Sequence, residues 1–508
     1  MATCDGDTTT TVTDELVLNY HLMHPGGDSQ PGDPNLAYHL DGTYHLHYIL
    51  RHPWYGDSAP VRPGEAEVSF SFIHVTSPDM LHWTWRTTKL QPSFTGHGMF
   101  SGTGFITKEG KPAAIYCGLS EPRHAFIAVA DDNDLSSWQK PYPVLPDGVP
   151  AGKDVRLLGD PDLFQVGDTY YTYSAGDDLE LCKSTDLVNW TYVGPLMQRE
   201  LPDVAQGEDT SCANLFPLGD KWMLLCISHQ LGCRYYLGDW DAAAEQFVPE
   251  THGRMNWRRA SQSLAEPAYR DFFAPESVLT PDGRRVMWAW LATADPATDL
   301  KSVQSLPREL RLGDDGSLRI EPLSELESLR YDALTLHDVT FTSPDSRSDR
   351  PGHVTEKIAD LDGDSFEIRI TVDRAEANRN RFGVQLFADD GGEGLLILLR
   401  PESGTLCVGE TEAPFAVADL PAGEDLELRI FVDKYLVEVF ANGRQAALSV
   451  LMGYRDGGNQ LRGYIFDRSD KAAPTTFRTV EIWKLKPTNQ GFFEARESRI
   501  WQPDTQSR

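Results

Sequence analysis

The chain has 508 residues and a formal net charge of −30, from 46 lysines and arginines against 76 aspartates and glutamates. A chain of this length is too long for one hydrophobic core, so we expect at least two domains. The negative charge argues against nucleic acid or an anionic membrane as a partner, and no segment approaches the roughly 20 apolar residues of a membrane span.

The start of the chain and its cysteines bear on localisation. Residues 1–7 lack the basic and apolar regions of a signal peptide. Seven cysteines in a chain of this length do not form the pattern of a disulfide framework. We therefore expect a cytoplasmic protein, or a secreted one if a leader has been removed.

A hairpin pattern occurs five times before residue 330. In each copy, a polar or small residue leads into an apolar strand, then a turn containing glycine or aspartate, then a second strand. The copies begin near Asp33, Ser101, Asp160, Cys212 and Ala274.

A second motif lies between the hairpins and ends in Trp83, Trp138 and Trp190, with spacings of 55 and 52 residues. Repeats of about 50 residues that carry four short strands are typical of β-propeller blades. Helical periodicity is scarce along the chain. These observations predict an all-β protein whose residues 15–330 form a five-bladed β-propeller.

The sequence pattern changes at about residue 340. Apolar and polar residues alternate strictly over 366–372, 426–432 and 436–440, as they do in half-buried strands. Repeated short strands without the tryptophan motif predict a C-terminal β-sandwich over residues 338–487, followed by a tail at 488–508.

Two of the hairpins begin with nearly the same residues. One follows Gly32-Asp33-Pro34-Asn35-Leu36 and the other follows Gly159-Asp160-Pro161-Asp162-Leu163. If both hairpins are equivalent blades of a closed repeat fold, the carboxylates of Asp33 and Asp160 point at the same axis. Two converging carboxylates suggest acid–base or nucleophilic chemistry, and sugar hydrolysis above all.

Six motifs in chain order resemble those of glycoside hydrolase family 32, the β-fructofuranosidases such as invertases, inulinases and levanases. They lie at 32–35, 99–103, 159–164, 271–276, 305–310 and 438–443. The resemblance runs from about residue 18 to 485 and implies a five-bladed β-propeller followed by a β-sandwich. It also implies retaining hydrolysis of β-fructofuranosides such as sucrose, fructo-oligosaccharides or fructans, through a covalent fructosyl-enzyme intermediate. A fructosyltransferase using the same intermediate and a non-catalytic carbohydrate-binding propeller are the alternatives.

The resemblance also implies roles for single residues. Asp33 is the expected nucleophile, and Asp160 is expected to bind ring hydroxyls and to stabilise the transition state. The expected sugar contacts are Asn35, Trp54, Phe100, Ser101 and Glu276.

The general acid does not follow from a direct match. The family's acid is a glutamate that precedes a cysteine, and alignment on Cys212 puts Ser211 in its place. A shift of three residues brings in Glu208, whose side chain has the reach and the pKa that the role favours. We predict Glu208 as the acid, Asp209 as the second candidate and Glu276 as the third.

Three further departures concern the sugar pocket. Gly159 stands where the family has arginine, Ile49 where it has glutamine, and Phe72 where it has tryptophan. We therefore expect an altered pocket, which makes fructosyl transfer or action on another furanoside more plausible.

The expected partner is a fructose-containing oligosaccharide or polysaccharide, with no cofactor and no metal. Cys226, His229 and Cys233 lack the second pair of ligands that a zinc site needs. A homo-oligomer is compatible with the sequence.

Overall fold

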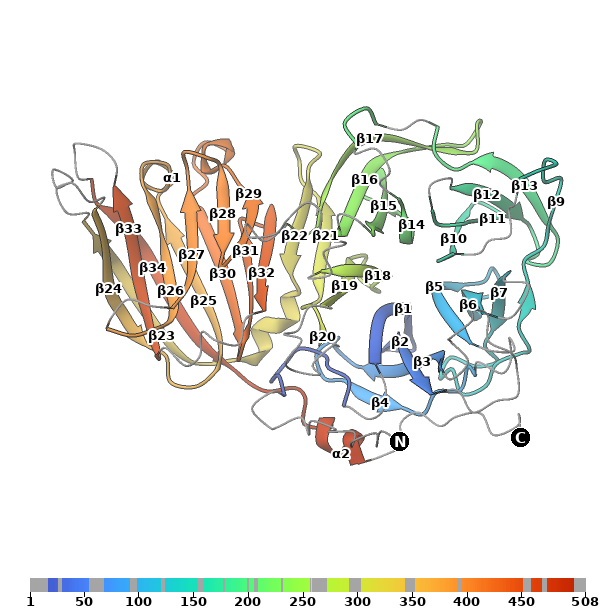
Figure 1. The fold of residues 1–508 in the computed structure, drawn as a ribbon, viewed down its shortest axis with the longest axis horizontal. Coiled ribbons are helices and arrows are strands. Elements are labelled where there is room, and N and C mark those ends of the chain that lie inside the picture. The colour runs from blue at the N-terminus through green and yellow to red at the C-terminus, as the bar shows by residue number, and fades with distance from the viewer. Residues whose placement is uncertain are drawn as a thin grey trace, which may run out of the picture.

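The computed structural model gives the protein as an all-β chain with few helices (Figure 1). It describes residues 17–25, 30–53, 68–91, 98–119, 124–153, 159–176, 179–198, 201–204, 209–229, 232–255, 257, 272–291, 303–342, 352–390, 394–450, 458–467 and 473–497. Among these residues, no helix has both the length and the apolar character needed to cross a membrane.

In the part of the chain that the structure describes, residues up to 322 form five sheets, in which most neighbouring strands are antiparallel. The first contains β1 (Gln30–Leu40), β2 (Thr43–Pro53), β3 (Val68–Ser77) and β4 (Thr84–Arg86). The second contains β5 (Met99–Ile106), β6 (Pro112–Gly118), β7 (His124–Val129) and β8 (Tyr142–Pro143). The third contains β10 (Asp162–Val166), β11 (Thr169–Tyr173), β12 (Glu180–Ser184), β13 (Trp190–Pro195) and β9 (Pro146–Asp147).

The fourth sheet contains β14 (Ser211–Leu218), β15 (Lys221–Ser228), β16 (Gly232–Asp241) and β17 (Gln246–Arg254). The fifth contains β18 (Phe273–Leu279), β19 (Arg285–Leu291), β21 (Arg308–Leu312) and β22 (Leu318–Pro322), with β20 (Val303–Gln304) paired to β19. The first strands of the five sheets contact one another in a closed cycle, β1 to β5, β10, β14, β18 and back to β1. Figure 1 shows the sheets arranged around this cycle.

The five predicted hairpins are confirmed as the antiparallel pairs β1–β2, β5–β6, β10–β11, β14–β15 and β18–β19. The turn between β1 and β2 illustrates why they form. Asp41 and Gly42 have φ of 48° and 82°, in the left-handed region that a two-residue hairpin turn needs. The sequence places there two residue types that tolerate this conformation.

The remaining strands form two six-stranded sheets that pack face to face. One contains β23 (Arg330–Phe341), β34 (Thr475–Leu485), β25 (Ser365–Val372), β30 (Leu426–Asp433), β31 (Leu436–Ala441) and β32 (Gln445–Val450). The other contains β24 (Gly352–Asp360), β33 (Gln460–Asp467), β26 (Arg381–Ala388), β27 (Leu395–Arg400), β28 (Thr405–Val408) and β29 (Thr411–Pro414). The short helices are η3 (Ser324–Leu329), α1 (Arg374–Ala377), η4 (Val417–Asp419) and α2 (Phe492–Glu497).

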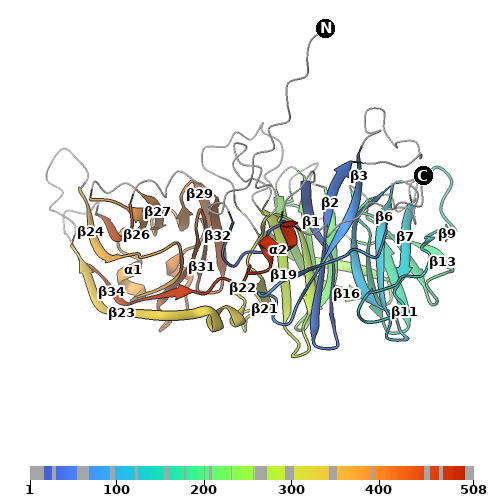
Figure 2. The same ribbon diagram turned by 90° about the horizontal axis from the view of Figure 1, so that it is seen from below.

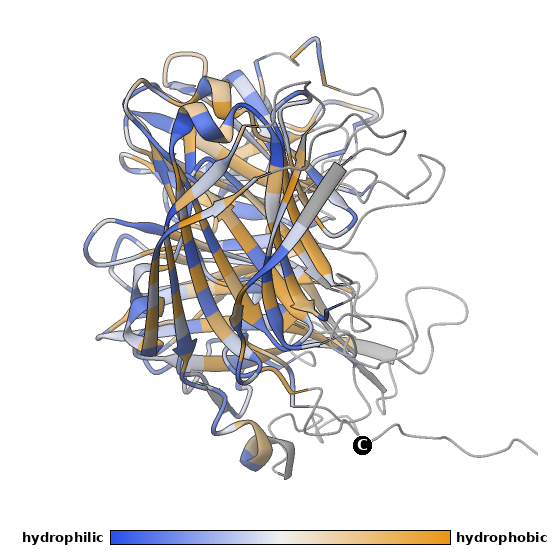
Figure 3. Ribbon diagram, turned by 90° about the vertical axis from the view of Figure 1, so that its left-hand side faces the viewer, coloured by the Kyte–Doolittle hydropathy of each residue, from blue (hydrophilic) through white to orange (hydrophobic). Residues whose placement is uncertain are grey.

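Apolar side chains from both six-stranded sheets form one core, as a β-sandwich requires. The three alternating segments predicted from the sequence lie in β25, β30 and β31. Figure 3 shows hydrophobic and hydrophilic residues alternating along such strands. Figure 2 shows the ring of sheets and the sandwich side by side along the molecule.

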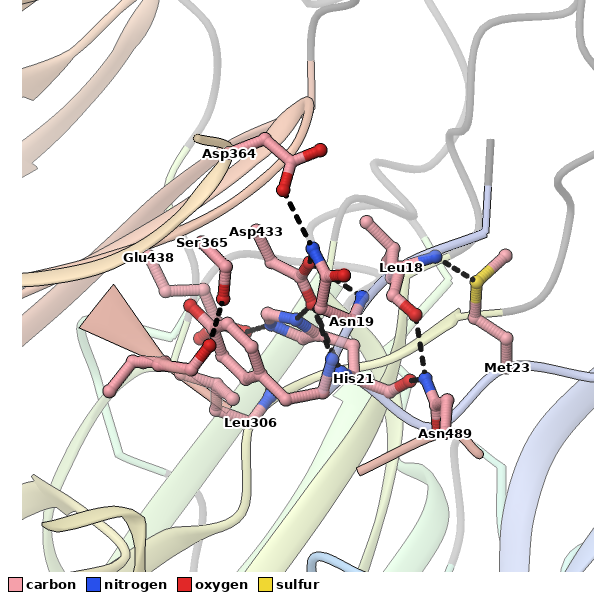
Figure 4. Close-up of polar contacts among 12 residues, drawn as sticks. Leu18, Asn19, His21, Met23, Leu306, Asp364, Ser365, Asp433, Glu438 and Asn489 are labelled. Carbon is pink, nitrogen blue, oxygen red and sulfur yellow. Dashed lines mark hydrogen bonds and ion pairs between the residues drawn. The ribbon is translucent and has the colours of Figure 1, made fainter. Parts of the chain in front are cut away.

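A buried polar network joins the ring to the sandwich (Figure 4). The ring nitrogens of His21 lie 2.8 Å from Asp433 Oδ2 and 3.3 Å from Glu438 Oε1. Glu438 also accepts hydrogen bonds from Leu306 N at 2.8 Å and from Arg308 Nη2 at 2.6 Å. Two of the motifs that carry the family resemblance, 305–310 and 438–443, therefore meet at the junction of the two parts.

Three histidines are packed inside the first sheet, between β2 and β3. His45 Nδ1 lies 3.0 Å from His74 Nε2, and the rings of His47 and His74 stack with centroids 4.4 Å apart. Burial lowers all three pKa values, to about 4 for His45 and about 3 for His47. The folded protein therefore holds these imidazoles neutral.

We expect this cluster to make the protein sensitive to acid. Because the folded pKa values lie below the unfolded value of 6.5, the stabilisation is present above pH 6.5 and is lost as pH falls toward 4. The measurement is the urea concentration at the unfolding midpoint, at pH 7 and at pH 5, for the wild type and for His47→Gln. The midpoint of the variant should fall less on acidification than that of the wild type. His39→Gln, on the same hairpin, is the control, and an equal acid response in all three proteins would contradict the expectation.

Candidate active site

The strands of the closed cycle, which we call the inner strands, have irregular pairing at one end of the ring of sheets. These irregularities turn side chains toward the axis of the ring. Register shifts occur in four of these strands, at Asn35/Ala37, Phe100/Gly102, Ser211/Asn214 and Phe273/Glu276. Asp160, Cys212 and Ala274 also have positive φ, of 28°, 44° and 47°. Bulges of this kind bend a strand and re-aim its side chains, and they are common beside active sites.

The residues at these irregularities form two layers. We call the residues near which the hairpins begin the first ring: Asp33, Ser101, Asp160, Cys212 and Ala274. The residues two positions later form the second ring: Asn35, Thr103, Asp162, Asn214 and Glu276. Residues of both rings line one small cavity.

The first ring brings the two predicted carboxylates together. Cys212 N donates to Asp160 Oδ2 at 3.1 Å, and Cys212 Sγ lies 3.4 Å from the same oxygen and 3.8 Å from Asp33 Oδ2. Ser101 Oγ donates to Asp33 Oδ2 at 3.1 Å. Both aspartates are buried, and their oxygens lie within about 7 Å of each other because both contact one sulfur atom.

The thiol of Cys212 is a hydrogen-bond donor in this arrangement and not a nucleophile. Burial raises its pKa well above the usual value, and the carboxylates of Asp160 and Asp33 raise it further. A protonated thiol between two carboxylates lowers their mutual repulsion by donating a weak hydrogen bond.

Hydrogen bonds of the second ring join four of the five neighbouring pairs of first strands. Asn35 Oδ1 accepts from Gly102 N at 2.9 Å, which links β1 to β5. Asp162 accepts from Thr103 Oγ1 at 2.8 Å and from Leu215 N at 2.7 Å, which links β10 to β5 and β14. Ser277 Oγ of β18 donates to Asn214 Oδ1 of β14 at 3.1 Å. The second ring therefore holds the first ring in place.

The second ring also contains two carboxyl groups with raised pKa values. Burial raises the pKa of Asp162 to about 6, although hydrogen bonds from Leu215, Thr103 and Tyr173 lower it. Burial raises the pKa of Glu276 well above its usual range, and the nearby Asp162 raises it further. Glu276, the third candidate acid, lines the small cavity with other residues of the second ring, and its role as acid stays a prediction.

Truncation of Asp162 tests this supporting role. We expect Asp162→Ala to lower the free energy of unfolding by about 3 kcal/mol, because Leu215 N and the Thr103 and Tyr173 hydroxyls lose a buried acceptor. Asp168→Ala, in the exposed turn of the same hairpin, is the control and should change stability by less than about 0.5 kcal/mol. Urea denaturation measures both, and equal effects would contradict the supporting role.

Of the three remaining predicted site residues, the structure describes only Phe100. Phe100 packs edge-on against Phe70, with ring centroids 5.1 Å apart. Trp54 and Glu208 lie outside the described residues, so their roles stay predictions.

Two family models match most of the chain. The model of the glycosyl hydrolases family 32 N-terminal domain matches residues 30–322, and the model of the glycosyl hydrolases family 32 C terminal matches residues 325–484. The chain belongs to glycosyl hydrolase family 32. The family boundary falls between β22 and η3, where the ring of sheets ends.

Relatives within family 32 cover most of the chain. A raffinose invertase from Escherichia coli is 26% identical over 478 residues, covering 88% of this chain and 91% of the relative. A levanase from Bacillus subtilis is 27% identical over 511 residues, covering 90% and 69%. Among solved structures, fructan 1-exohydrolase IIa from Cichorium intybus has a TM-score of 0.68 at 18% identity and covers 94% of this chain and 98% of its own, which supports the fold.

The departures from the family pattern have structural counterparts. Ile49 and Phe72, which stand at a glutamine and a tryptophan of the family, are 4% and 0% exposed and belong to a hydrophobic core. Ser211, which alignment on Cys212 puts at the place of the family's acid, donates from Oγ to Asp209 Oδ2 at 2.9 Å. Ile49 and Phe72 therefore serve core packing, and Ser211 is engaged in a hydrogen bond.

Asp209, the second candidate acid, carries a partner that the sequence analysis did not assign to it. His229 N donates to Asp209 Oδ1 at 2.8 Å, and His229 Nδ1 lies 2.6 Å from Asp209 Oδ2. Burial raises the pKa of Asp209, but the hydrogen bonds from His229 outweigh burial and the pKa is lowered. An ionised Asp209 is a poor proton donor, and no spacing in the sequence indicated that His229 is its partner.

Proposed function

We propose that this protein hydrolyses β-fructofuranosidic bonds with retention, through a covalent fructosyl-enzyme intermediate. The observation that carries the proposal is the convergence of Asp33 and Asp160 on Cys212 in a chain of family 32. Relatives named raffinose invertase, levanase and fructan 1-exohydrolase support fructose-containing substrates.

In this proposal the first ring performs the chemistry. A carboxylate oxygen of Asp33 attacks the anomeric carbon of the fructosyl unit, and Ser101 holds that carboxylate by a hydrogen bond of 3.1 Å. Asp160 accepts hydrogen bonds from sugar hydroxyls, which strengthen as positive charge develops on the ring. Departure of the alcohol also requires a proton donor.

The architecture that we infer for this activity is a five-bladed β-propeller followed by a β-sandwich. The closed cycle of first strands, each leading one sheet, supports the propeller. The domain division at residues 15–330 and 338–487, with a tail at 488–508, stays a prediction, and the family boundary near residue 323 is compatible with it. A homo-oligomer and a cytoplasmic or secreted location also stay predictions.

Product analysis tests the function. We expect sucrose, inulin or levan to release free fructose, because water attacks the intermediate in a hydrolase. Oligosaccharides longer than the substrate, or cyclic anhydrides, would instead indicate fructosyl transfer, the alternative that the altered pocket favours. Binding of these sugars without any product would overturn the proposal in favour of a carbohydrate-binding protein.

A further inference from the structure

A second cavity, of about 210 Å³, lies beyond the second ring along the inner strands. Thr103, Asn214 and Glu276 line both this cavity and the small cavity of the candidate active site, so one layer of side chains separates the two. Other lining residues, such as Gln165 and Pro217, lie farther along the same strands, toward the hairpin turns. We call this space the axial cavity.

Arg285, near the start of β19, is the one basic residue among the described residues that line the axial cavity. Its guanidinium stacks on the ring of Phe216, with Cζ 4.2 Å from the ring centroid. Its Nε is buried and has no hydrogen-bond partner, and no group in the described part of the chain accepts a hydrogen bond from the guanidinium or forms an ion pair with it. A desolvated cation without such a partner is costly.

The two carboxyl groups that line the axial cavity do not serve as this partner. Asp162 accepts hydrogen bonds from three other groups, and Glu276 Oε1 accepts from Ser277 N at 3.0 Å. Burial lowers the pKa of Arg285 to about 10, although the charges of Glu276 and Asp162 raise it. The guanidinium is therefore still a cation at neutral pH, and its N–H groups are unused.

We propose that the axial cavity binds a small oxyanion, a phosphate or a carboxylate, through the guanidinium of Arg285. Because one face of the guanidinium is stacked on Phe216, its N–H groups point outward in its own plane. Two such N–H groups match two oxygens of one oxyanion in a bidentate contact. The apolar rings of Phe164 and Phe216 line the same cavity and reduce the screening of this contact by water.

The charge of the whole protein makes such binding specific to this place. A net charge of −30 disfavours non-specific attraction of anions, so saturable binding reports a local cationic site. The site also exists only in the folded chain, because Phe216 lies on β14 and Arg285 on β19. A bound oxyanion should therefore stabilise the folded protein. This inference does not depend on the proposed function.

Calorimetric titration with inorganic phosphate at constant ionic strength tests the proposal. We expect saturable binding to the wild type with a Kd on the order of 1 mM, and binding at least about 10-fold weaker to Arg285→Gln. Arg285→Lys keeps the charge but loses the planar fork, so it should bind with intermediate affinity, and it serves for the comparison if Arg285→Gln does not fold. Phosphate should also raise the urea midpoint of the wild type more than that of Arg285→Gln.

The control variant is Arg311→Gln, which removes a guanidinium that is 55% exposed and paired with Glu321. It should bind phosphate as the wild type does. Titrations with acetate and with chloride complete the comparison: the tighter of phosphate and acetate identifies the kind of oxyanion. No saturable binding of either oxyanion to the wild type, unchanged binding to Arg285→Gln, or equally tight binding of chloride would overturn the proposal.

Discussion

Replacement of Asp33 by alanine is expected to lower kcat for sucrose on the order of 10⁴-fold or more, because the covalent step loses its nucleophile. The fold should persist, since the hydrogen bond from Gly102 N to Asn35 Oδ1 still links β1 to β5 when the bond from Ser101 to Asp33 is lost. Initial rates of fructose release measure the loss, and circular dichroism of the variant checks the fold.

A small anion distinguishes a missing nucleophile from a damaged pocket. Azide should enter the space left in Asp33→Ala and attack an activated fructosyl donor, which gives a fructosyl azide of inverted configuration. Asp41→Ala, at the far turn of the same hairpin, is the control and should retain wild-type activity. Wild-type fructose release from Asp33→Ala would remove the proposed nucleophile and with it the mechanism.

The largest expected effect on stability lies at the junction between the ring and the sandwich. We expect Glu438→Ala to lower the free energy of unfolding by about 3 to 5 kcal/mol, because a buried charge network loses its central acceptor. Arg308, 1% exposed, would be left as a buried cation without this carboxylate. Leu306 N would lose its acceptor, and His21 Nε2 would lose its contact with Glu438. Urea denaturation measures the change.

An exposed ion pair provides the contrast. Lys357 and Asp360 lie 2.7 Å apart with side chains 44% and 57% exposed, so Asp360→Ala should change stability by less than about 1 kcal/mol. A comparable loss in both variants would contradict a special role for the junction.

The pH dependence of the junction follows from His21. Burial lowers its pKa, but the hydrogen bonds to Asp433 and Glu438 outweigh burial and raise the pKa to about 9. The stabilisation is therefore fully present below pH 6.5 and is lost as pH rises through 9. The junction weakens in alkali, whereas the histidine cluster in the first sheet weakens in acid.

Local patterns in the sequence were sufficient to predict the strands and hairpins. A strand, a turn and a second strand lie next to one another in the chain, so alternation and residues such as Asp41-Gly42 predict them directly. The first-ring residues could also be predicted, because each stands near the start of a repeated hairpin pattern. Asp33 and Asp160 in addition share one Gly-Asp-Pro motif.

The contacts between copies could not be predicted in the same way. Asn35 and Gly102, or Asp162 and Leu215, are joined by one hydrogen bond each but lie far apart in the chain. The motif at 438–443 marks the family, but its contact with Leu306 follows only from the fold. The sequence offers His229 only as a metal ligand, since its partner Asp209 stands 20 residues earlier and no motif links the two.

The separation of the two rings has a consequence for how such a protein diversifies. Residues proposed to act on the substrate and residues that tie neighbouring sheets together lie two positions apart in the chain. A change at Ser101 or Cys212 removes a side-chain contact to Asp33 or Asp160, whereas a change at Asp162 leaves Thr103 Oγ1 of β5 and Leu215 N of β14 without their acceptor. Substitutions in the first ring are therefore expected to disturb closure of the ring less than substitutions at Asp162.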